Sequence, residues 1–357
     1  SSGNKTETVT NEVGSTTTTV TKPDGTVTET TKQPDGSKEV VETKKDGSST
    51  TTVEQKDGSS SVTKVDTEGT VTSEVTLSDS AVSSAQEGKT YASLPIPSLP
   101  VTSDKAKAPT VTVDLPKDTA VQVEIPVENV TPGTVAILVG ADGSETVIQN
   151  TRLTEKGVAV SLTDGETVKI VDNSKSFTDV AKTHWASDAV AFVVSRGLVL
   201  GTSDTTFAPE LTTSRSMMVT VLWRMVGQTQ GEGSLSFTDV EADSWYTEAV
   251  RWAAGSGIVT GYTAETFGPA DNITREQMAA ILYRYADKMG YDVTGRADLS
   301  GYADAGKVSD WTADAMAWAV DQGLITGKTG GILDPQGQAT RAEIATIFMR
   351  FCENVVK

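Results

Sequence analysis

Few side chains in this 357-residue sequence could do catalytic or metal-binding chemistry. Cys352 is the only cysteine and His184 the only histidine, which excludes intrachain disulfides, cysteine-rich zinc sites and multi-histidine metal sites. His184 stands before Trp185 in an expected loop, where we interpret it as a solvated cap. Catalysis would therefore depend on carboxylates or hydroxyls, and no spacing places two carboxyl groups in one cleft on rigid elements. We predict that this chain is no enzyme and holds no cofactor and no metal.

Charge limits the partners that the chain can bind. Its 48 acidic and 30 basic residues give a net charge of −18, which disfavours a nucleic-acid groove and an anionic membrane surface. Such a chain can still bind an anion where a few arginines are locally focused. No apolar run is long enough for a transmembrane helix, so we expect no membrane insertion and no nucleic-acid partner. The start at Ser1, without methionine, indicates a piece of a longer or processed product, so any catalytic domain should lie upstream.

Residues 1–78 form a low-complexity segment, rich in Thr and Ser, with a period of eleven from Ser15 onward. Each period is a β-forming segment closed by a turn pair, for which we expect a two-residue hairpin turn. Calcium binding is the alternative use of repeated Asp-Gly, but the sequence has neither EF-hand spacing nor the glycine-rich nonapeptide, which favours turns. Because each segment offers only one or two apolar residues, we predict either a thin hairpin ribbon or a disordered stalk. The turn pairs are Asp24-Gly25, Asp35-Gly36, Asp46-Gly47, Asp57-Gly58 and Glu68-Gly69.

The next two segments differ from that stalk and from each other. Residues 79–109 include Leu94-Pro95-Ile96-Pro97, and because proline fixes φ and removes donors, they are predicted to be a stiff Pro/Ser linker. Residues 110–173 alternate apolar and polar positions in five to six short segments, separated by turn signals such as Asp142-Gly143. That alternation predicts a small β-sandwich or barrel, which we interpret as a structural spacer.

Three copies of one pattern follow Asn173. The first two copies are offset by 60 residues and the next two by 66, and both offsets hold at the tryptophan, the glycine and the arginine of the pattern. Agreement in both order and spacing indicates a structural repeat. The landmarks are Phe177-Thr178-Asp179-Val180, Phe237-Thr238-Asp239-Val240 and Tyr302-Ala303-Asp304-Ala305; Trp185, Trp245 and Trp311; glycine segments ending at Gly201, Gly261 and Gly327; and Ser214-Arg215-Ser216, Thr274-Arg275-Glu276 and Thr340-Arg341-Ala342.

Each copy is predicted to contain two helices around a loop. In the second copy Trp245, Ala249 and Ala253 fall four residues apart, so they share one face of a first helix that ends at Gly257. One such pair of helices buries too little surface to be stable alone. We therefore expect three helical hairpins to pack around a shared axis.

The second helix of each copy begins with a cap and continues with a buried stripe. A capping box is predicted where a Thr is followed three residues later by Gln or Glu, and apolar residues at i, i+3, i+4 and i+7 then indicate the buried face. The caps are Thr274 with Gln277, Thr340 with Glu343 and, lacking the reciprocal partner, Ser214 with Met217. The stripes are Met218, Val221, Leu222 and Met225; Met278, Ile281, Leu282 and Tyr285; and Ile344, Ile347, Phe348 and Phe351.

This order of landmarks resembles the S-layer homology family over residues 176–357, with copies at 176–232, 234–297 and 299–357. The resemblance implies a pseudo-threefold unit whose inter-repeat grooves bind a secondary cell-wall polysaccharide linked to peptidoglycan, commonly ending in pyruvylated N-acetylmannosamine. It also implies a bacterial, Firmicutes-type surface protein that lies outside the cell, at the cell wall or S-layer, and is anchored non-covalently. The expected fold class is multidomain: a β-rich N-terminal half, with a hairpin ribbon or disordered stalk and then a small β-sandwich, followed by an all-α three-repeat pseudo-trimer.

The resemblance further implies which arginines bind the ligand. The family's ligand arginine falls on Arg215, Arg275 and Arg341. Each is expected in the first turn of a second helix, where free N–H groups and the helix dipole favour an anion. A guanidinium can give a carboxylate two parallel hydrogen bonds. The alternative is a surface ion pair, which is the ordinary role of an arginine in a first helical turn.

Other residues are assigned to the grooves by the same resemblance. The acids accept sugar hydroxyls and the glycines let the backbone approach; these residues are Asp179, Asp239, Asp304, Gly201, Gly261 and Gly327. The tryptophans are either sugar-stacking platforms or, as burial of large aromatic residues favours, core anchors; they are Trp185, Trp245 and Trp311. The third groove departs from the pattern, since Tyr302 replaces Phe and Leu333-Asp334-Pro335 replaces Phe-Gly-Pro.

Two other functions stay open beside anchoring. Many surface enzymes carry such repeats, so the chain can belong to a wall-associated hydrolase whose catalytic domain lies upstream. The third possibility is self-association into an S-layer lattice.

Overall fold

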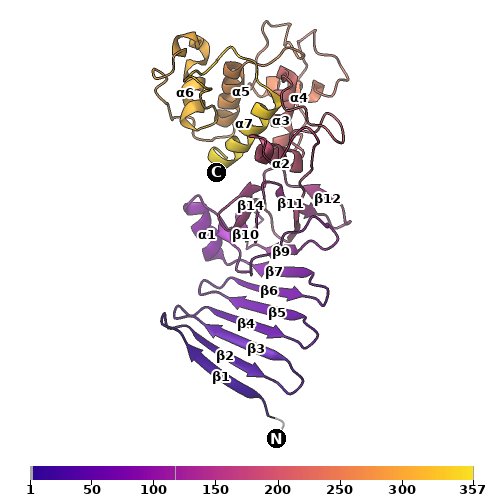
Figure 1. Cartoon of the computed structure of the whole chain (residues 1–357), viewed down its shortest axis with the longest axis vertical. Coiled ribbons are helices and arrows are strands. Elements are labelled where there is room, and N and C mark those ends of the chain that lie inside the picture. Colours follow the sequence, from indigo (N-terminus) through magenta and orange to yellow (C-terminus); the bar gives the residue numbers. More distant parts are fainter. Residues whose placement is uncertain (1–2, 117, 357) are drawn as a thin grey trace. The chain divides into compact units, whose positions relative to one another are not determined.

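The computed structural model describes residues 3–116 and 118–356, so the expectation drawn from Ser1 lies outside the described residues. The chain divides into two compact units, Ser1–Asn173 and Ser174–Lys357. The first unit is built mainly of strands and the second of helices and loops (Figure 1). None of the helices in the described ranges has the length and apolar composition required to cross a membrane.

The Thr-rich segment forms an ordered ribbon rather than a disordered stalk. Strands β1 to β7 pair antiparallel in chain order, and each has six residues (Figure 1). The strands are β1 (Lys5–Thr10), β2 (Thr16–Thr21), β3 (Val27–Lys32), β4 (Lys38–Thr43), β5 (Ser49–Glu54), β6 (Ser60–Val65) and β7 (Val71–Thr76).

The turn between β2 and β3 shows how the Asp-Gly pairs are used. Gly25 N–H donates to Lys22 O (3.0 Å), Lys22 N–H donates to Thr26 O (2.8 Å), and Gly25 has a φ of +88°. The turn runs from Lys22 to Gly25, and its last residue is the bulge glycine of a three-residue hairpin loop, so the predicted two-residue turn is wrong. The Asp24 Oδ1 atom accepts a hydrogen bond from Thr26 N–H (2.8 Å), which gives the carboxylate a turn function.

Hydroxyl pairs across neighbouring strands supplement the backbone ladder of this single layer. The Oγ1 atoms of Thr17 and Thr31 lie 2.9 Å apart, and Thr63 Oγ1 lies 2.8 Å from Ser73 Oγ. Cross-strand Thr pairs of this kind stabilise a sheet by a few tenths of a kcal/mol to ~1 kcal/mol each. The ribbon therefore needs few apolar residues.

The ribbon continues into the second β region. Strand β7 pairs in parallel with β9, and the eleven-stranded sheet then runs through β15, β11 and β12. A four-stranded sheet, in the order β13-β14-β10-β8, contributes to the same core. The elements are α1 (Asp79–Glu87), β8 (Ala92–Ser93), β9 (Thr110–Asp114), β10 (Val121–Pro126), β11 (Thr134–Val139), β12 (Glu145–Val147), β13 (Arg152–Leu153), β14 (Gly157–Leu162) and β15 (Glu166–Asp172).

The predicted fold class is therefore wrong for this half of the chain. It separates a ribbon from a small β-sandwich, whereas one sheet spans both. Strands β7 and β9 would each leave a row of backbone groups unpaired at an edge, and their parallel pairing satisfies both rows. The segment predicted as an extended linker instead contains α1 and β8, which place Val82, Ala85 and Ala92 in the core.

In the helical unit each first helix packs against the second helix of a different copy. The packed pairs are α4 with α3, α6 with α5, and α2 with α7, so the contacts pass from each copy to the next and close into a cycle. The prediction of a packed helical hairpin within each copy is therefore wrong. The elements are α2 (Ser187–Ser195), α3 (Arg215–Met225), α4 (Thr247–Gly255), α5 (Arg275–Lys288), the short 3-10 helices η1 (Ala305–Lys307) and η2 (Asp310–Thr312), α6 (Ala313–Asp321) and α7 (Arg341–Asn354).

Backbone hydrogen bonds join the copies where their loops meet. Thr213 N–H donates to Ala339 O (2.9 Å), Ala339 N–H to Ile273 O (3.0 Å), and Ile273 N–H to Thr213 O (2.8 Å), which forms a closed triangle. Buried backbone groups require such partners. Isolated antiparallel bridges flank the triangle; they pair Thr212 with Thr340, Ser214 with Asn272, and Thr274 with Gln338. All the helices and 3-10 helices of this unit lie in or between the repeats, so the helical expectation for this half broadly holds.

The predictions for the second helices are confirmed. Complete capping boxes begin α5 and α7, whereas Ser214 accepts a bond from Met217 N–H (3.2 Å) at the start of α3 without a reciprocal side-chain bond. All the predicted stripe residues are buried. The first helix of the second copy, α4, ends at Gly255, and Gly257 just after it has a φ of +73°, as expected of a glycine that terminates a helix.

We expect Thr213→Val to raise the free energy of unfolding by about 1 kcal/mol. Among the described residues, the buried Thr213 Oγ1 atom has no hydrogen-bond partner, and the matching residues Ile273 and Ala339 are apolar. Burial of an unpaired hydroxyl costs about 1–3 kcal/mol. Denaturant unfolding checks this expectation. The matched control is Thr220→Val, which should destabilise the unit because Thr220 Oγ1 donates to Ser216 O (2.8 Å).

Candidate functional site

The three arginines assigned to ligand binding begin the second helices, as predicted, but they are buried. Arg215, Arg275 and Arg341 are the first residues of α3, α5 and α7, and only 6%, 4% and 6% of their surfaces are exposed. The alternative of a solvated surface ion pair therefore does not describe them. Each of the three side chains lies where one copy of the repeat meets another.

Each of these guanidinium groups bonds the next copy in the cycle. Arg215 Nε donates to Phe267 O (3.0 Å) and Arg215 Nη2 donates to Thr260 O (3.2 Å). We call each such contact a junction and name it by its arginine. The other junctions repeat it: Arg275 donates to Leu333 O (2.8 Å) and Thr326 O (3.0 Å), and Arg341 donates to Phe207 O (2.8 Å) and Leu200 O (2.5 Å). Much of the guanidinium fork is thus used to hold the copies together.

The three loop acids fix the segment that receives the arginine. Asp239 accepts hydrogen bonds from Phe267 N–H (2.9 Å) and Gly268 N–H (2.8 Å), and Asp304 accepts from Leu333 N–H (2.7 Å) and Asp334 N–H (2.8 Å). Asp179 bonds Phe207 and Ala208 in the same way. The hydrogen bond from Leu333 is the largest cause that holds the pKa of Asp304 below its usual value. These carboxylates therefore stay ionised and are already occupied by backbone donors.

The three glycines are required by an aromatic ring in their own copy. A Cβ atom on Gly261 would lie 2.5 Å from Phe237 Cε1, and one on Gly201 would lie 2.7 Å from Phe177 Cε1. Gly327 faces Tyr302 at the same distance of 2.7 Å. The glycine lets this ring pack directly on the loop that accepts the arginine.

The Arg215 junction opens into a cavity of about 330 Å³. The cavity brings together Arg215 of the first copy, Gly261 of the second and Trp311 of the third, so three of the four assigned kinds of residue meet there. None of the assigned acids is among its lining residues. Its other lining residues are Val259, Thr260, Tyr262, Gln277, Ala280, Ile281 and Arg284. An adjacent cavity of about 670 Å³ shares residues 259–262 and extends past Phe237 and Arg251.

The tryptophans of the repeat are exposed, so their interpretation as core anchors is wrong. Trp185, Trp245 and Trp311 are 62%, 56% and 59% exposed. They precede the first helices or, for Trp311, lie in η2. The aromatic residues that the first helices bury are instead Phe192, Trp252 and Trp318, which follow the exposed tryptophans by seven residues in every copy. That constant offset was available in the sequence as a signal.

Two cations line the Arg215 cavity without a carboxylate among the lining residues. Burial is the largest cause that lowers the pKa of Arg215; the positive charge of Arg284 adds to it, whereas the negative charges of Asp271 and Asp239, which do not line the cavity, oppose it. Arg284 is half-buried, and within the described residues its side chain makes no hydrogen bond or ion pair. Its equivalents are occupied, since Arg224 Nη1 donates to Leu198 O (2.9 Å) and Arg350 Nη1 to Leu324 O (3.4 Å). The cavity therefore presents an available guanidinium.

Sequence reasoning missed Arg284. The signal was its position on α5, because Gln277, Ala280, Ile281 and Arg284 follow the i, i+3, i+4, i+7 spacing of one helix face. Gln277, on the same face, already accepts a hydrogen bond from Thr274 N–H (3.1 Å). The face of α5 that begins at the capping residue Gln277 therefore also lines the Arg215 cavity.

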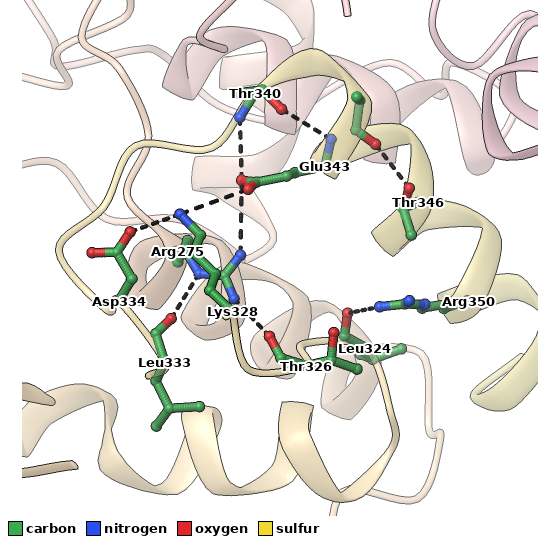
Figure 2. Close-up of polar contacts among 11 residues, drawn as sticks. Arg275, Leu324, Thr326, Lys328, Leu333, Asp334, Thr340, Glu343, Thr346 and Arg350 are labelled. Atoms are coloured by element: carbon green, nitrogen blue, oxygen red, sulfur yellow. Dashed lines mark hydrogen bonds and ion pairs between the residues drawn. The ribbon is translucent and has the colours of Figure 1, made fainter. Parts of the chain in front are cut away.

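The Arg275 junction differs in charge, as Figure 2 shows. Glu343 Oε2 lies 3.7 Å from Arg275 Nη1, and Glu343 Oε1 lies 3.8 Å from Lys328 Nζ. Lys328 Nζ also lies 2.7 Å from Asp334 Oδ2. This junction thus contains its own carboxylates.

Comparison with known proteins places the repeats in a family. The S-layer homology domain model matches residues 176–216, 236–279 and 301–345. The chain therefore carries three S-layer homology repeats, which confirms the resemblance. These domains mediate cell-wall anchoring, and the chain is an extracellular, cell-wall-associated protein.

Three curated relatives align over about half of this chain. An amylopullulanase of Thermoanaerobacterium thermosulfurigenes is 31% identical over 50% of the chain and 10% of its own length. The surface-layer 125 kDa protein of Lysinibacillus sphaericus is 34% identical over 48% of the chain and 14% of its own length. The exoglucanase XynX of Acetivibrio thermocellus is 29% identical over 54% and 18%. The alignments thus span less than a fifth of each of these relatives.

We expect Arg341→Lys to lower the free energy of unfolding by about 2–3 kcal/mol. Lysine cannot span the carbonyls of both Phe207 and Leu200, and a lost hydrogen bond from a charged donor costs about 1.5–3 kcal/mol. Denaturant unfolding measures the loss. Arg284→Gln is the matched comparison and should change stability by less than about 0.5 kcal/mol, as for an unpaired surface residue. Equal effects of the two changes would contradict the assigned roles.

Proposed function

We propose that the three S-layer homology repeats anchor this chain by binding an acidic sugar of a secondary cell-wall polysaccharide in the Arg215 cavity. The observation that carries the proposal is the pairing of Arg215 and Arg284 in one cavity whose lining has no carboxylate, in a chain of net charge −18. Two positive charges concentrated in one cavity favour an anion, even in a chain of negative net charge. The ligand group that fits is a carboxylate.

Each lining group has a defined part in this proposal. Arg284 offers two parallel hydrogen bonds to the carboxylate, as in a pyruvyl ketal, and Arg215 adds positive charge from the cavity wall. Trp311 and Tyr262, both exposed, present ring faces to the sugar. The wall combines apolar side chains such as Val259, Ala280 and Ile281 with a few placed polar groups, a combination that small-ligand sites use. The adjacent cavity provides room for the next sugar of a polymer.

The proposed role is binding without turnover. A glycosidase needs two carboxyl groups across the scissile bond, and neither the Arg215 cavity nor its neighbour offers such a pair, since the only acid lining either is Glu232. We propose that any hydrolase activity of the complete protein belongs to another segment. Release of sugar from wall polysaccharide by this chain would overturn this part of the proposal.

We expect Arg284→Gln to weaken co-sedimentation with polymer-bearing walls by about tenfold to hundredfold, because it removes a charge-assisted contact worth about 1.5–3 kcal/mol. Apparent dissociation constants from sedimentation at varied wall concentration give the measurement. Lys182→Gln, which removes one exposed positive charge elsewhere in the unit, should leave binding unchanged.

The same assay tests the ligand group. Walls treated with mild acid to remove ketal-linked pyruvate should no longer bind the wild-type chain. Added salt should weaken binding to untreated walls. Equal binding to treated and untreated walls would refute the carboxylate. Ordered arrays formed by the purified chain without wall polymer would instead favour lattice self-assembly.

Trp311→Ala should weaken wall binding while leaving the unfolding midpoint unchanged, because the ring is 59% exposed and lines the cavity. Sedimentation and thermal unfolding of the same sample separate the two effects. Leu211→Ala, which truncates a comparably exposed apolar side chain in a loop outside the cavity lining, is the control. Unchanged wall binding by Trp311→Ala would remove the ring from the proposed site.

A further inference from the structure

The segment that carries Trp311 is bonded to a different copy of the repeat. Glu276, the second residue of α5, is buried, and its carboxylate accepts hydrogen bonds from Ser309 N–H (3.0 Å), Ser309 Oγ (2.8 Å) and Thr312 Oγ1 (3.1 Å). Gln336 Nε2 donates to the same carboxylate (2.5 Å). A buried carboxylate requires donors of this kind. Because Ser309 and Thr312 stand on either side of Trp311, these bonds tie the backbone of the tryptophan to α5.

The other two copies have no carboxylate at the position of Glu276. Its counterparts are Ser216 in α3 and Ala342 in α7, by the offsets that relate the three copies. Within the described residues, the Ser216 hydroxyl bonds only the Ser214 hydroxyl (2.9 Å), and the methyl side chain of Ala342 cannot accept a hydrogen bond. A carboxylate tie of this kind therefore belongs to the tryptophan of the third copy.

In the other two copies a hydroxyl on the first residue of the first helix closes the tryptophan loop within its own copy. Thr247 Oγ1 donates to Glu241 O (2.6 Å), and Ser187 Oγ donates to Lys182 O (3.2 Å). The counterpart in the third copy is Ala313, which has no hydroxyl. The third copy therefore replaces this internal bond with the bonds to α5.

Helix α5 also forms one wall of the Arg215 cavity. Gln277 and Arg284 line the cavity from α5, Trp311 lines it from η2, and η2 packs against α5. One helix thus carries the available guanidinium and holds the segment of the exposed ring. The position of Trp311 relative to Arg284 is therefore set before a ligand arrives, which lowers the ordering cost of binding.

We infer that Glu276 is a positioning residue of the acidic-sugar site, because it holds Trp311 in place relative to Arg284. This inference rests on the proposed function of the Arg215 cavity. Glu276 is not among the lining residues of that cavity, so it acts through the ring and not on the ligand. Without its carboxylate, the segment of Trp311 loses its side-chain bonds to α5, and the ring must be ordered when the sugar binds.

Glu276→Ala tests this role with a residue that the fold accepts at the same position. Helix α7 has Ala342 there and still begins with a complete capping box. We expect Glu276→Ala to weaken the affinity of the intact chain for a methyl glycoside of N-acetylmannosamine with a pyruvate ketal about fivefold to tenfold, because the ring is no longer pre-organised. Calorimetric titration measures the affinity, and circular dichroism verifies the fold.

A double-mutant cycle with Trp311→Ala separates positioning from a general effect on structure. In the Trp311→Ala background, Glu276→Ala should change the affinity by less than about twofold, because the ring through which it acts is absent. Thr220→Val is the control: it removes a hydrogen bond in α3 outside the cavity lining, and should lower the unfolding midpoint without changing the affinity. Ser309→Ala removes one donor to Glu276 from the other copy, and provides the same cycle should Glu276→Ala fail to fold.

The outcomes distinguish this inference from the proposed function. If wild type binds the glycoside, an unchanged affinity in Glu276→Ala overturns this inference alone. An equal loss of affinity with and without the Trp311 ring does so as well. Failure of wild type to bind the glycoside overturns the proposed function and this inference together.

Discussion

The helical unit depends on the closed triangle of backbone hydrogen bonds among Thr213, Ile273 and Ala339. Each copy donates once and accepts once, and all three residues are buried. Loss of one copy would leave a buried N–H and a buried C=O unpaired, at a cost of about 1–3 kcal/mol each. The exchange of helix partners acts in the same direction, because every first helix relies on another copy for its apolar contact. The three repeats therefore form one cooperative unit.

The triangle also explains why the repeat arginines are structural. Each follows a triangle residue by two positions, and its own backbone N–H donates to a neighbouring copy, as Arg215 N–H does to Asp271 O (2.9 Å). The side chain therefore starts at the boundary between copies and bonds the next loop. A guanidinium that holds two carbonyls is poorly placed to provide the whole ligand contact as well. An available cation must come from elsewhere on the wall, and Arg284 on α5 has that position.

Local chemistry was predictable from the sequence, whereas the choice of partner was not. Capping boxes and apolar stripes depend on residues within one helix, so Thr274 with Gln277 could be recognised directly. Periodicity identifies the buried face of a helix but not what covers it, and so the exchange of helices between copies was missed. The prediction that Trp311 is buried was wrong for a related reason: Trp311 precedes the helix, where periodicity no longer determines burial. The pairing of β7 with β9 likewise joins strands separated by a helix in the sequence.

A cyclic repeat creates sites with the same backbone geometry, so differences between them must come from side chains that the fold tolerates. The third residue of the second helix is such a position. Gln277 and Glu343 both complete a capping box, and α3 forms with Met217 and no reciprocal cap. Because these three side chains are compatible with the same helix start, the charge at this position can change without altering the architecture.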